Sequence, residues 1–273
     1  MEKLQRALQK ARQQRVGQPP ARAAGSGRGT VSNERVDALW ADLTPFEPSS
    51  KQLLRNRVVS YRPGRDASAV DILRTKTLLH MRKQNWKRLA ITSATSGCGK
   101  TTTLCNIAIG ITRQPDVRAI LFDLDLRRPS IAKVLDAKPV HEVTDMLTGK
   151  IGFEDQALRI RSNLAVCLAL QPAADPMRYL MSRQTQETLK DIERRYKPDL
   201  MLFDLPPMKI DADTPGFLGN VDCALIMARA SKTTVSELDK CEREVAEHTN
   251  VMGVILNQYR HGEGTSGYSE YSE

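Results

Sequence analysis

The stretch Ala94-Thr95-Ser96-Gly97-Cys98-Gly99-Lys100-Thr101-Thr102 decides the fold. It follows an apolar run at residues 89–91 and precedes apolar residues at helical spacing between Leu104 and Ile111. The order strand, glycine loop, helix is the setting that a phosphate-binding loop requires. Backbone N–H groups and the helix dipole at a helix N-terminus bind anions. The stretch therefore predicts a nucleoside triphosphate site, although alanine stands at position 94 where the full pattern has glycine.

The loop residues have distinct expected roles. Lys100 would reach the outer phosphates, and the Thr101 hydroxyl would ligate Mg²⁺, so ATP and Mg²⁺ are the expected ligands. The alternative is an ordinary strand-to-helix turn that contains a chance Gly-Lys-Thr. The residues expected to surround the nucleotide are Ser96, Gly97, Cys98, Gly99, Lys100, Thr101 and Thr102.

Strand and helix patterns alternate from about residue 66 onward. Apolar strand candidates lie at residues 88–93, 118–123, 164–169, 199–204, 223–228 and 252–257, and helical patterns lie before Arg82 and at 100–113, 179–196 and 233–248. This alternation predicts an α/β fold with a doubly wound, mostly parallel sheet of the P-loop NTPase kind, spanning residues 66–258. Ligands of such sheets bind at the carboxyl ends of the strands.

Aspartates stand at two of these carboxyl ends. Asp123 ends the second candidate strand, and Asp125 follows two residues later. Residues two apart on a strand face the same side, so the pair can share one site if the extended geometry persists. Asp204 ends the fourth candidate strand after four apolar residues, which is the usual form of the Mg²⁺-organising acid in phosphate-loop NTPases. Neighbouring carboxylates predict a bound cation; the alternative is a surface Asp pair countered by Arg127 and Arg128.

Charge is distributed unevenly along the 273 residues. The net charge is +9, of which residues 1–65 carry +8 and residues 66–273 carry +1. A near-neutral domain argues against a nucleic-acid-binding face, so no nucleic acid partner is expected. No apolar run approaches the roughly 20 residues of a membrane span, and no signal-peptide pattern opens the chain. Five scattered cysteines predict reduced, buried thiols and a cytoplasmic location, with recruitment to the inner face of the membrane left open.

The N-terminal arm divides into two predicted parts. Residues 1–15 predict a basic amphipathic helix that docks on a partner or is a solvated terminus, with an acidic membrane surface the less favoured target. Residues 16–65, rich in Pro, Gly, Ser and Arg, predict a flexible linker. Within it Val36, Leu39, Trp40 and Phe46 predict either a short docking segment or a segment packed on the domain.

Together the motifs resemble a known family. The glycine loop, the element Asp123-Leu124-Asp125-Leu126-Arg127-Arg128-Pro129 and the sequence Asp204-Leu205-Pro206-Pro207 are similar to those of the bacterial protein-tyrosine kinases (BY-kinases) of capsular and exopolysaccharide loci. The resemblance covers about residues 66–273. It implies a cytosolic domain that autophosphorylates a tyrosine-rich C-terminal tail with MgATP and regulates polysaccharide synthesis or export.

The resemblance also assigns residue roles. The implied catalytic residues are Lys100, Asp123 and Asp125, and the implied metal ligands are Thr101, Asp125 and Asp204. Asp123 is the better candidate to accept the tyrosine proton, and Asp125 would help to hold Mg²⁺ through water. These two roles stay interchangeable, because a sequence fixes neither geometry. Asn257 would lie near the adenine.

The last 15 residues contain three of the six tyrosines, Tyr259, Tyr268 and Tyr271, among Gly, Ser and Glu. Flexible polar tails rarely need aromatic side chains for packing. Residues 259–273 are therefore predicted to be a tail that carries the phosphoacceptors. The alternative for Tyr259, which follows the last strand directly, is a ring docked on the domain.

The chain departs from the family in the helix before the first strand. Family members usually carry Glu-x-x-Arg-x-x-Arg there, which supports ring assembly, whereas this chain has Ser68, Asp71 and Arg74. A homo-oligomer therefore stays open. A separate membrane activator, a polysaccharide co-polymerase, is the expected partner, with the basic arm as its docking element.

Two other functions stay open. One is a non-kinase ATPase switch of the partition or division-site type, and the other is a regulatory scaffold that binds nucleotide without transferring phosphate. Switch ATPases usually carry Lys two residues before the Gly-x-Gly-Lys core. Thr95 occupies that position here, which argues against the switch.

Overall fold

A computed structural model describes residues 33–209 and 212–259 of the chain. The predicted helix at residues 1–15, most of the predicted tail, and Tyr268 and Tyr271 lie outside the described residues.

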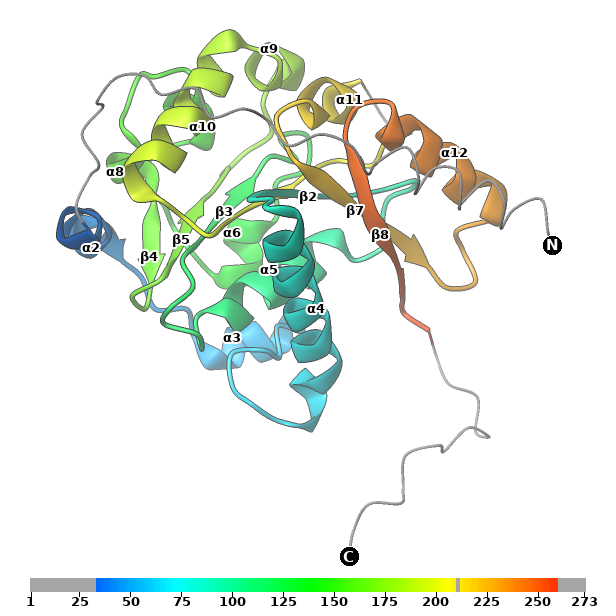
Figure 1. Cartoon of the computed structure of the whole chain (residues 1–273), viewed down its shortest axis with the longest axis horizontal. Coiled ribbons are helices and arrows are strands. Elements are labelled where there is room, and N and C mark those ends of the chain that lie inside the picture. Colours follow the sequence, from blue (N-terminus) through cyan, green and yellow to red (C-terminus); the bar gives the residue numbers. More distant parts are fainter. Residues whose placement is uncertain (1–32, 210–211, 260–273) are drawn as a thin grey trace, which may run out of the picture. The chain divides into compact units, whose positions relative to one another are not determined.

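The described residues build one eight-stranded sheet in the order β1-β4-β5-β3-β6-β2-β7-β8 (Figure 1). Every neighbouring pair is parallel except β4 and β5. The predicted doubly wound, mostly parallel sheet is confirmed, as are all six predicted strands. The strands are β1 (Thr44–Pro45), β2 (Arg88–Ser93), β3 (Ala119–Asp123), β4 (Leu158–Ile160), β5 (Leu164–Cys167), β6 (Leu200–Asp204), β7 (Cys223–Arg229) and β8 (Asn250–Asn257).

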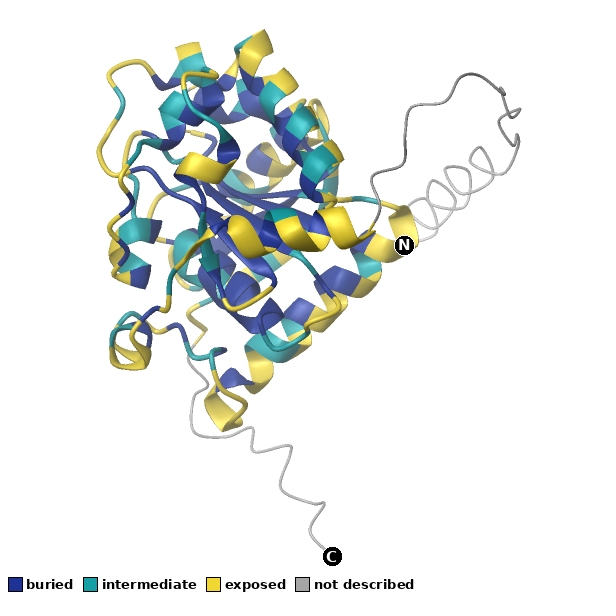
Figure 2. Ribbon diagram, turned by 90° about the vertical axis from the view of Figure 1, so that its left-hand side faces the viewer, coloured by how far each residue is buried: buried dark blue, intermediate teal, exposed yellow. Residues whose placement is uncertain are grey.

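Helices cover both faces of this sheet (Figures 1 and 2). The crossover from β2 to β3 and the crossover from β7 to β8 run in opposite directions along the sheet. Because parallel crossovers are right-handed, their helices α5 and α12 lie on opposite faces. The helices are α2 (Asn33–Asp42), α3 (Ser50–Arg55), the 3₁₀ turn η1 (Arg65–Ala67), α4 (Ser68–Gln84), α5 (Lys100–Ile111), α6 (Ile131–Leu135), α7 (Val143–Leu147), α8 (Phe153–Gln156), α9 (Pro176–Leu180), α10 (Arg183–Tyr196), α11 (Asp213–Leu218) and α12 (Val235–Ala246).

Two of the long helices begin at residues of types that commonly cap helix N-termini. The Ser182 hydroxyl accepts the backbone N–H of Thr185 at the start of α10, at 3.0 Å. At the start of α12, Thr234 and Glu237 form a reciprocal capping box. Such caps satisfy amide groups that have no partner within the helix, so they fix where each helix begins.

The central strands are buried on both faces, which is why they appear in the sequence as continuous apolar runs (Figure 2). Phe122 on β3 and Phe203 on β6 stack with their ring centroids 5.0 Å apart. All five cysteines are buried and free, which confirms the predicted reduced thiols. Among the described helices, none has the length and apolarity to cross a bilayer.

Residues 33–65 are folded onto the domain, so the predicted linker over residues 16–65 is wrong for this part. Trp40 is 1% exposed, and its indole N–H donates to the carbonyl of Tyr196 at 2.8 Å. Val36, one helical turn earlier on α2, is also buried. Leu53 and Val58 belong to the main hydrophobic core. A few apolar residues at helical spacing were enough to anchor a polar segment, which confirms the alternative in which it packs on the domain.

We expect Trp40→Ala to lower the free energy of unfolding by about 3–5 kcal/mol, because it removes a fully buried indole and leaves the Tyr196 carbonyl unpaired. Urea denaturation followed by circular dichroism measures the change. Leu39→Ala on the same helix is the control, since Leu39 is only half-buried, and it should cost much less. Equal stability of the Trp40 variant and the wild type would mean that α2 does not pack as described.

Arg74 lies inside the domain. Its guanidinium donates to the carbonyl of Gly110 on α5 at 2.8 Å and pairs with Asp71 at 3.1 Å. A methyl group at Gly110 would lie 3.1 Å from the same guanidinium, so the glycine leaves room for the arginine. The one arginine that matches the family's assembly motif therefore ties α4 to α5 in this chain.

Candidate active site

The glycine loop connects β2 to α5 and has the backbone shape that its glycines permit. Gly97 and Gly99 have φ angles of +76° and +87°, in the left-handed region that favours glycine. The Cys98 side chain is buried, with its thiol 3.2 Å from the carbonyl of Thr95. The thiol therefore packs beneath the loop, and α5 begins at Lys100 with its N-terminal amides at the loop.

The end of β8 holds this loop in place. The Asn257 amide donates to the carbonyl of Cys98 at 2.9 Å, and the Gln258 amide donates to the carbonyl of Gly97 at 3.2 Å. The family resemblance indicated Asn257 only as a neighbour of the adenine, and it assigned no role to Gln258. Both contacts join segments about 160 residues apart, so no local pattern could predict them.

We expect Gly99→Ala to weaken nucleotide binding roughly 10- to 100-fold. The added methyl group would lie 2.4 Å from the Asn257 amide nitrogen, and φ of +87° is strained for any residue with a Cβ. To relieve this clash, the Asn257 amide must move and break its hydrogen bond to the carbonyl of Cys98. Titration with a fluorescent ATP analogue measures the loss.

Gly219→Ala is the control for this substitution, because nothing lies within 4 Å of the added methyl group there and φ is −64°. It should bind nucleotide like the wild type. Unchanged affinity in Gly99→Ala as well would show that the loop shape does not govern binding.

Below the loop lies a pair of buried carboxylates. Asp123 and Asp204 stand opposite each other at the ends of β3 and β6. The Thr101 hydroxyl donates to Asp204 Oδ2 at 2.5 Å, and Ser130 donates its hydroxyl to Thr101 at 3.2 Å. Asp123 Oδ2 accepts the backbone amides of Ser130 and Ile131. The Oδ1 atoms of both aspartates are buried without a hydrogen-bond partner among the described residues.

Burial disfavours the charge on these acids. Burial, and then the neighbouring charge of Asp204, raises the pKa of Asp123 well above its ordinary value. Burial raises the pKa of Asp204 to about 7, against the opposing hydrogen bond from Thr101 and the charge of Lys100. A cation at this position would relieve both effects. The site therefore has the electrostatics of a metal site.

A threonine hydroxyl and carboxylate oxygens are ligands that suit Mg²⁺. The described residues contain no group of three or more His, Cys, Asp or Glu side chains arranged to hold a metal. In nucleotide enzymes one or two carboxylates usually hold Mg²⁺ together with phosphate oxygens and water. The unpartnered Oδ1 atoms and the Thr101 hydroxyl thus fit a magnesium ion carried by a nucleotide.

The extended geometry on which a shared face of Asp123 and Asp125 depended does not hold, although the charge of Asp125 still acts on Asp123 and on Asp204. The strand β3 ends at Asp123, and a turn follows in which the backbone amide of Arg128 donates to the carbonyl and to Oδ1 of Asp125. The extended geometry therefore does not persist past residue 123. Asp123 points into the protein with no exposed surface, and Asp125 lines the open cavity.

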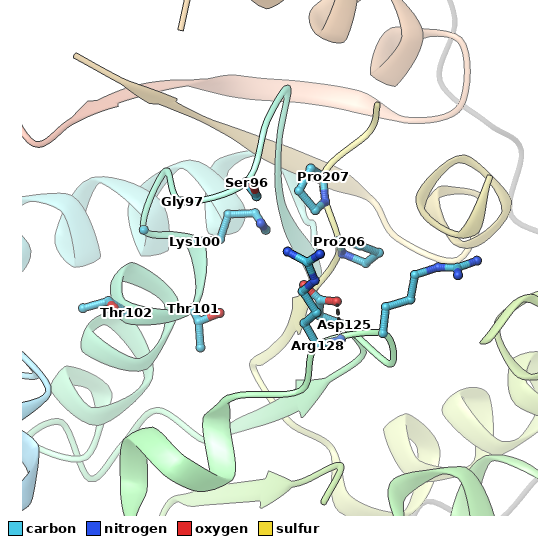
Figure 3. Close-up of a pocket in the computed structure, with 11 residues that line it drawn as sticks. Ser96, Gly97, Lys100, Thr101, Thr102, Asp125, Arg128, Pro206 and Pro207 are labelled. Atoms are coloured by element: carbon cyan, nitrogen blue, oxygen red, sulfur yellow. Dashed lines mark hydrogen bonds between the residues drawn. The ribbon is translucent and has the colours of Figure 1, made fainter. Parts of the chain in front are cut away.

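The cavity beside the loop has a volume of about 500 Å³. Figure 3 shows Ser96 and Lys100 on its loop side, and Asp125 and Arg128 on the turn after β3. Burial raises the pKa of Asp125, while the charges of Lys100 and Arg128 oppose the shift. The lining residues are Ser96, Gly97, Gly99, Lys100, Thr101, Thr102, Asp125, Arg127, Arg128, Pro206 and Pro207. Seven of the predicted site residues thus converge here, whereas Cys98, Asp123, Asp204, Asn257 and Tyr259 do not line the cavity.

A second cavity, of about 530 Å³, lies at the ends of β7 and β8. Three cationic side chains, Arg57, Arg229 and Lys232, line it together with Gln258 and Tyr259. Arg229 also approaches the loop, since its guanidinium would lie 3.7 Å from a methyl group at Gly97. Tyr259 is 62% exposed. The first predicted phosphoacceptor therefore stands at the rim of a basic cavity next to the glycine loop.

Comparison with known proteins identifies the family of this fold. Residues 89–273 match the model of the CobQ/CobB/MinD/ParA nucleotide binding domain. The fold, the glycine loop and this match define the class of the chain as a P-loop nucleotide-binding protein.

Individual relatives narrow the class. The chain is 30% identical over 189 residues to tyrosine-protein kinase YwqD of Bacillus subtilis, which covers 68% of this chain and 76% of that protein. It is 30% identical over 210 residues to tyrosine-protein kinase wzc of Salmonella typhi, covering 74% of this chain and 29% of that longer protein. The kinase domain of Escherichia coli tyrosine kinase ETK superposes with a TM-score of 0.66 at 25% identity, covering 77% of this chain and 82% of that one. The chain belongs to the bacterial protein-tyrosine kinase family.

Proposed function

We propose that this chain transfers the γ-phosphate of ATP to tyrosines of its own C-terminal residues. One observation carries the proposal: a single cavity brings together the phosphate loop, Lys100 and the carboxylate Asp125, and Thr101 in its lining donates to Asp204 of the buried carboxylate pair. A cavity of this kind holds a triphosphate and leaves one carboxylate facing an incoming hydroxyl. The family relationship supports tyrosine as the bearer of that hydroxyl.

Each loop residue has a role in this proposal. The backbone amides of residues 96–102 bind the phosphates, and Lys100 neutralises charge that develops on the transferred group. Thr101 and Asp204 would hold Mg²⁺, and the unpartnered Oδ1 of Asp123 would be a further oxygen available to it. When bound, Mg²⁺ neutralises phosphate charge and aligns the outer phosphates for transfer.

Asp125 faces the acceptor. Its carboxylate takes the proton from the tyrosine hydroxyl, the phenolic oxygen forms a bond to the γ-phosphorus, and the bond from that phosphorus to the β-phosphate oxygen breaks to release ADP. A carboxyl group with a raised pKa is suited to accept a proton near neutral pH. The sequence left open which aspartate accepts the tyrosine proton and which helps to hold Mg²⁺. The geometry favours Asp125 as the proton acceptor and Asp123 on the side of the metal.

The nucleoside lies across the ends of β7 and β8 in this proposal. The basic cavity adjoins the loop and is large enough for a base and sugar. Asn257, whose amide supports the loop from below, would then lie near the adenine as the resemblance implied.

The cellular role follows from the family relationship. We propose that the chain acts in the cytoplasm, regulates capsular or exopolysaccharide synthesis, and is activated by a separate membrane protein. The basic residues before position 66 supply a docking element of suitable charge for that partner or for the inner face of the membrane. A homo-oligomer would need contacts other than Arg74, which is occupied within the domain.

The experiment is to incubate the purified chain with MgATP and to map phosphate by mass spectrometry. Phosphate on Tyr259, Tyr268 or Tyr271 supports the proposal. ATP hydrolysis and dimerisation without phosphotyrosine, in the purified chain and in the chain recovered from its native cells, would favour the ATPase switch. Nucleotide binding without turnover in both preparations would favour the regulatory scaffold.

A further inference from the structure

Two neighbouring arginines on the turn after β3 have different surroundings. Arg127 is anchored, because its guanidinium pairs at 2.6 Å with Asp213, which is fully buried. Arg128 is exposed and lines the active-site cavity. Within residues 33–209 and 212–259, no hydrogen bond or ion pair engages the Arg128 guanidinium. One arginine thus holds the turn, and the other presents a positive charge to whatever enters the cavity.

The residues beyond position 259 have a matching charge pattern. Residues 260–273 contain three glutamates and a single arginine, in a chain whose overall charge is +9. Glutamate stands two residues after Tyr268 and two residues after Tyr271. Tyr259 has His261 at that position. The sequence therefore distinguishes two of the three candidate acceptors from the third.

The spacing of two residues has a geometric meaning. In an extended segment, side chains at i and i+2 point to the same side, with their Cα atoms about 6.6 Å apart. A tyrosine that directs its hydroxyl towards Asp125 therefore directs the following glutamate into the same cavity. Arg128, three residues after Asp125 on the same turn, also lines this cavity, and unlike its neighbour Arg127 it is not held by Asp213 (Figure 3).

We propose that Arg128 binds the carboxylate two residues after the acceptor tyrosine, and so determines which tyrosines are phosphorylated. This inference rests on the proposed kinase function. It selects Tyr268 and Tyr271 as acceptors over Tyr259, and it defines the substrate class as Tyr-x-Glu segments.

The tail starts close enough for this contact. The Gln258 side chain touches the carbonyl of Gly97, and Gly97 lines the cavity. Tyr268 lies nine positions after Tyr259, a stretch that an extended chain spans in about 30 Å. The acceptor segment thus begins at the rim of the site it would enter.

The first test uses three added peptides that differ only in having Glu, Gln or Lys two residues after a single tyrosine. The wild type should phosphorylate the Glu peptide with a kcat/KM about tenfold higher than the Gln peptide, mainly through KM, and Arg128→Gln should remove this preference. Arg128→Glu should instead prefer a Lys peptide. Arg183→Gln, at an exposed arginine on α10 far in sequence from the turn, is the control and should behave like the wild type.

The second test uses the full chain with Glu270→Lys and maps phosphate after a short incubation with MgATP. Phosphorylation of Tyr268 should fall about tenfold while that of Tyr271 is retained, which provides an internal control. Equal use of the Glu and Gln peptides by the wild type would overturn the inference and leave the kinase function standing. An equal fall in kcat for the Glu and Gln peptides in Arg128→Gln would also overturn it, because Arg128 would then act on the phosphoryl group. Phosphorylation of no tyrosine in any arm would overturn the inference and the proposed kinase function together.

Discussion

Lys100→Met is expected to lower tyrosine phosphorylation by roughly 10²–10³-fold while leaving the fold intact. Lys100 is the loop's only charged side chain, it lines the active-site cavity, and its charge acts on Asp125 and Asp204. Removing one preorganised charge that stabilises the developing transition state typically costs two to three orders of magnitude. Methionine keeps the length and apolar body of the side chain, so the core beneath the loop should not change. Initial rates of phosphotyrosine formation at saturating ATP measure the effect.

Lys138→Met, at an exposed lysine outside the cavity, is the matched control and should retain the wild-type rate. Thermal unfolding of both variants should stay within a few degrees of the wild type. A Lys100→Met chain that phosphorylates its tyrosines at the wild-type rate would contradict the role of the loop in phosphate transfer.

Asp204→Asn is expected to abolish activity and, at the same time, to stabilise the nucleotide-free protein at alkaline pH. The folded protein raises the pKa of Asp204 to about 7 from an ordinary 3.8, chiefly through burial. Between these two values the unfolded chain releases a proton that the folded chain keeps. Wild-type stability therefore falls as the pH rises from about 4 to 7, and the loss is complete above 7. Asp204→Asn has no carboxyl group to ionise at this position, so it does not undergo this loss of stability.

The stability difference at pH 8 should be roughly 1–3 kcal/mol in favour of Asp204→Asn, and it should vanish near pH 4. Urea denaturation at several pH values measures it. Saturating MgATP analogue should stabilise the wild type and not the variant, since asparagine removes the charge that holds the metal. Asp136→Asn is the control, because Asp136 is exposed in a left-handed conformation that asparagine also accepts. If Asp204→Asn lowered stability at pH 8, the charged Asp204 carboxylate would not destabilise the nucleotide-free protein, contrary to this prediction.

Much of the fold could be predicted because the buried parallel strands consist of short, continuous apolar runs in the sequence. β3 and β6 each end in an aspartate, so the sequence alone placed Asp123 and Asp204 at one edge of the sheet, and their register confirms it. The segments that escaped prediction are short or weakly apolar. β4 has three residues and runs antiparallel to β5, and α2 is held by little more than Val36 and Trp40.

The site could be predicted only where its residues are close in sequence. The residue types and spacing of the glycine loop determine its conformation locally, so the positions of Lys100 and Thr101 in the site could be predicted from this stretch alone. The different environments of Asp123, which is buried, and Asp125, which lines the cavity, depend on where β3 ends, and the sequence pattern does not show that point. The support of the loop by Asn257 and Gln258 depends on β8 lying beside β7, and the anchoring of Arg127 depends on the buried start of α11. Such contacts are set by tertiary packing.

Single turnover of ATP labelled on the γ-phosphate tests the central claim most directly. With the chain in excess over nucleotide and Mg²⁺ present, we predict that most of the label appears on tyrosine, and that changing Tyr268 and Tyr271 together to phenylalanine removes most of that transfer. Label released entirely as inorganic phosphate, with every tyrosine unmodified, would contradict the account.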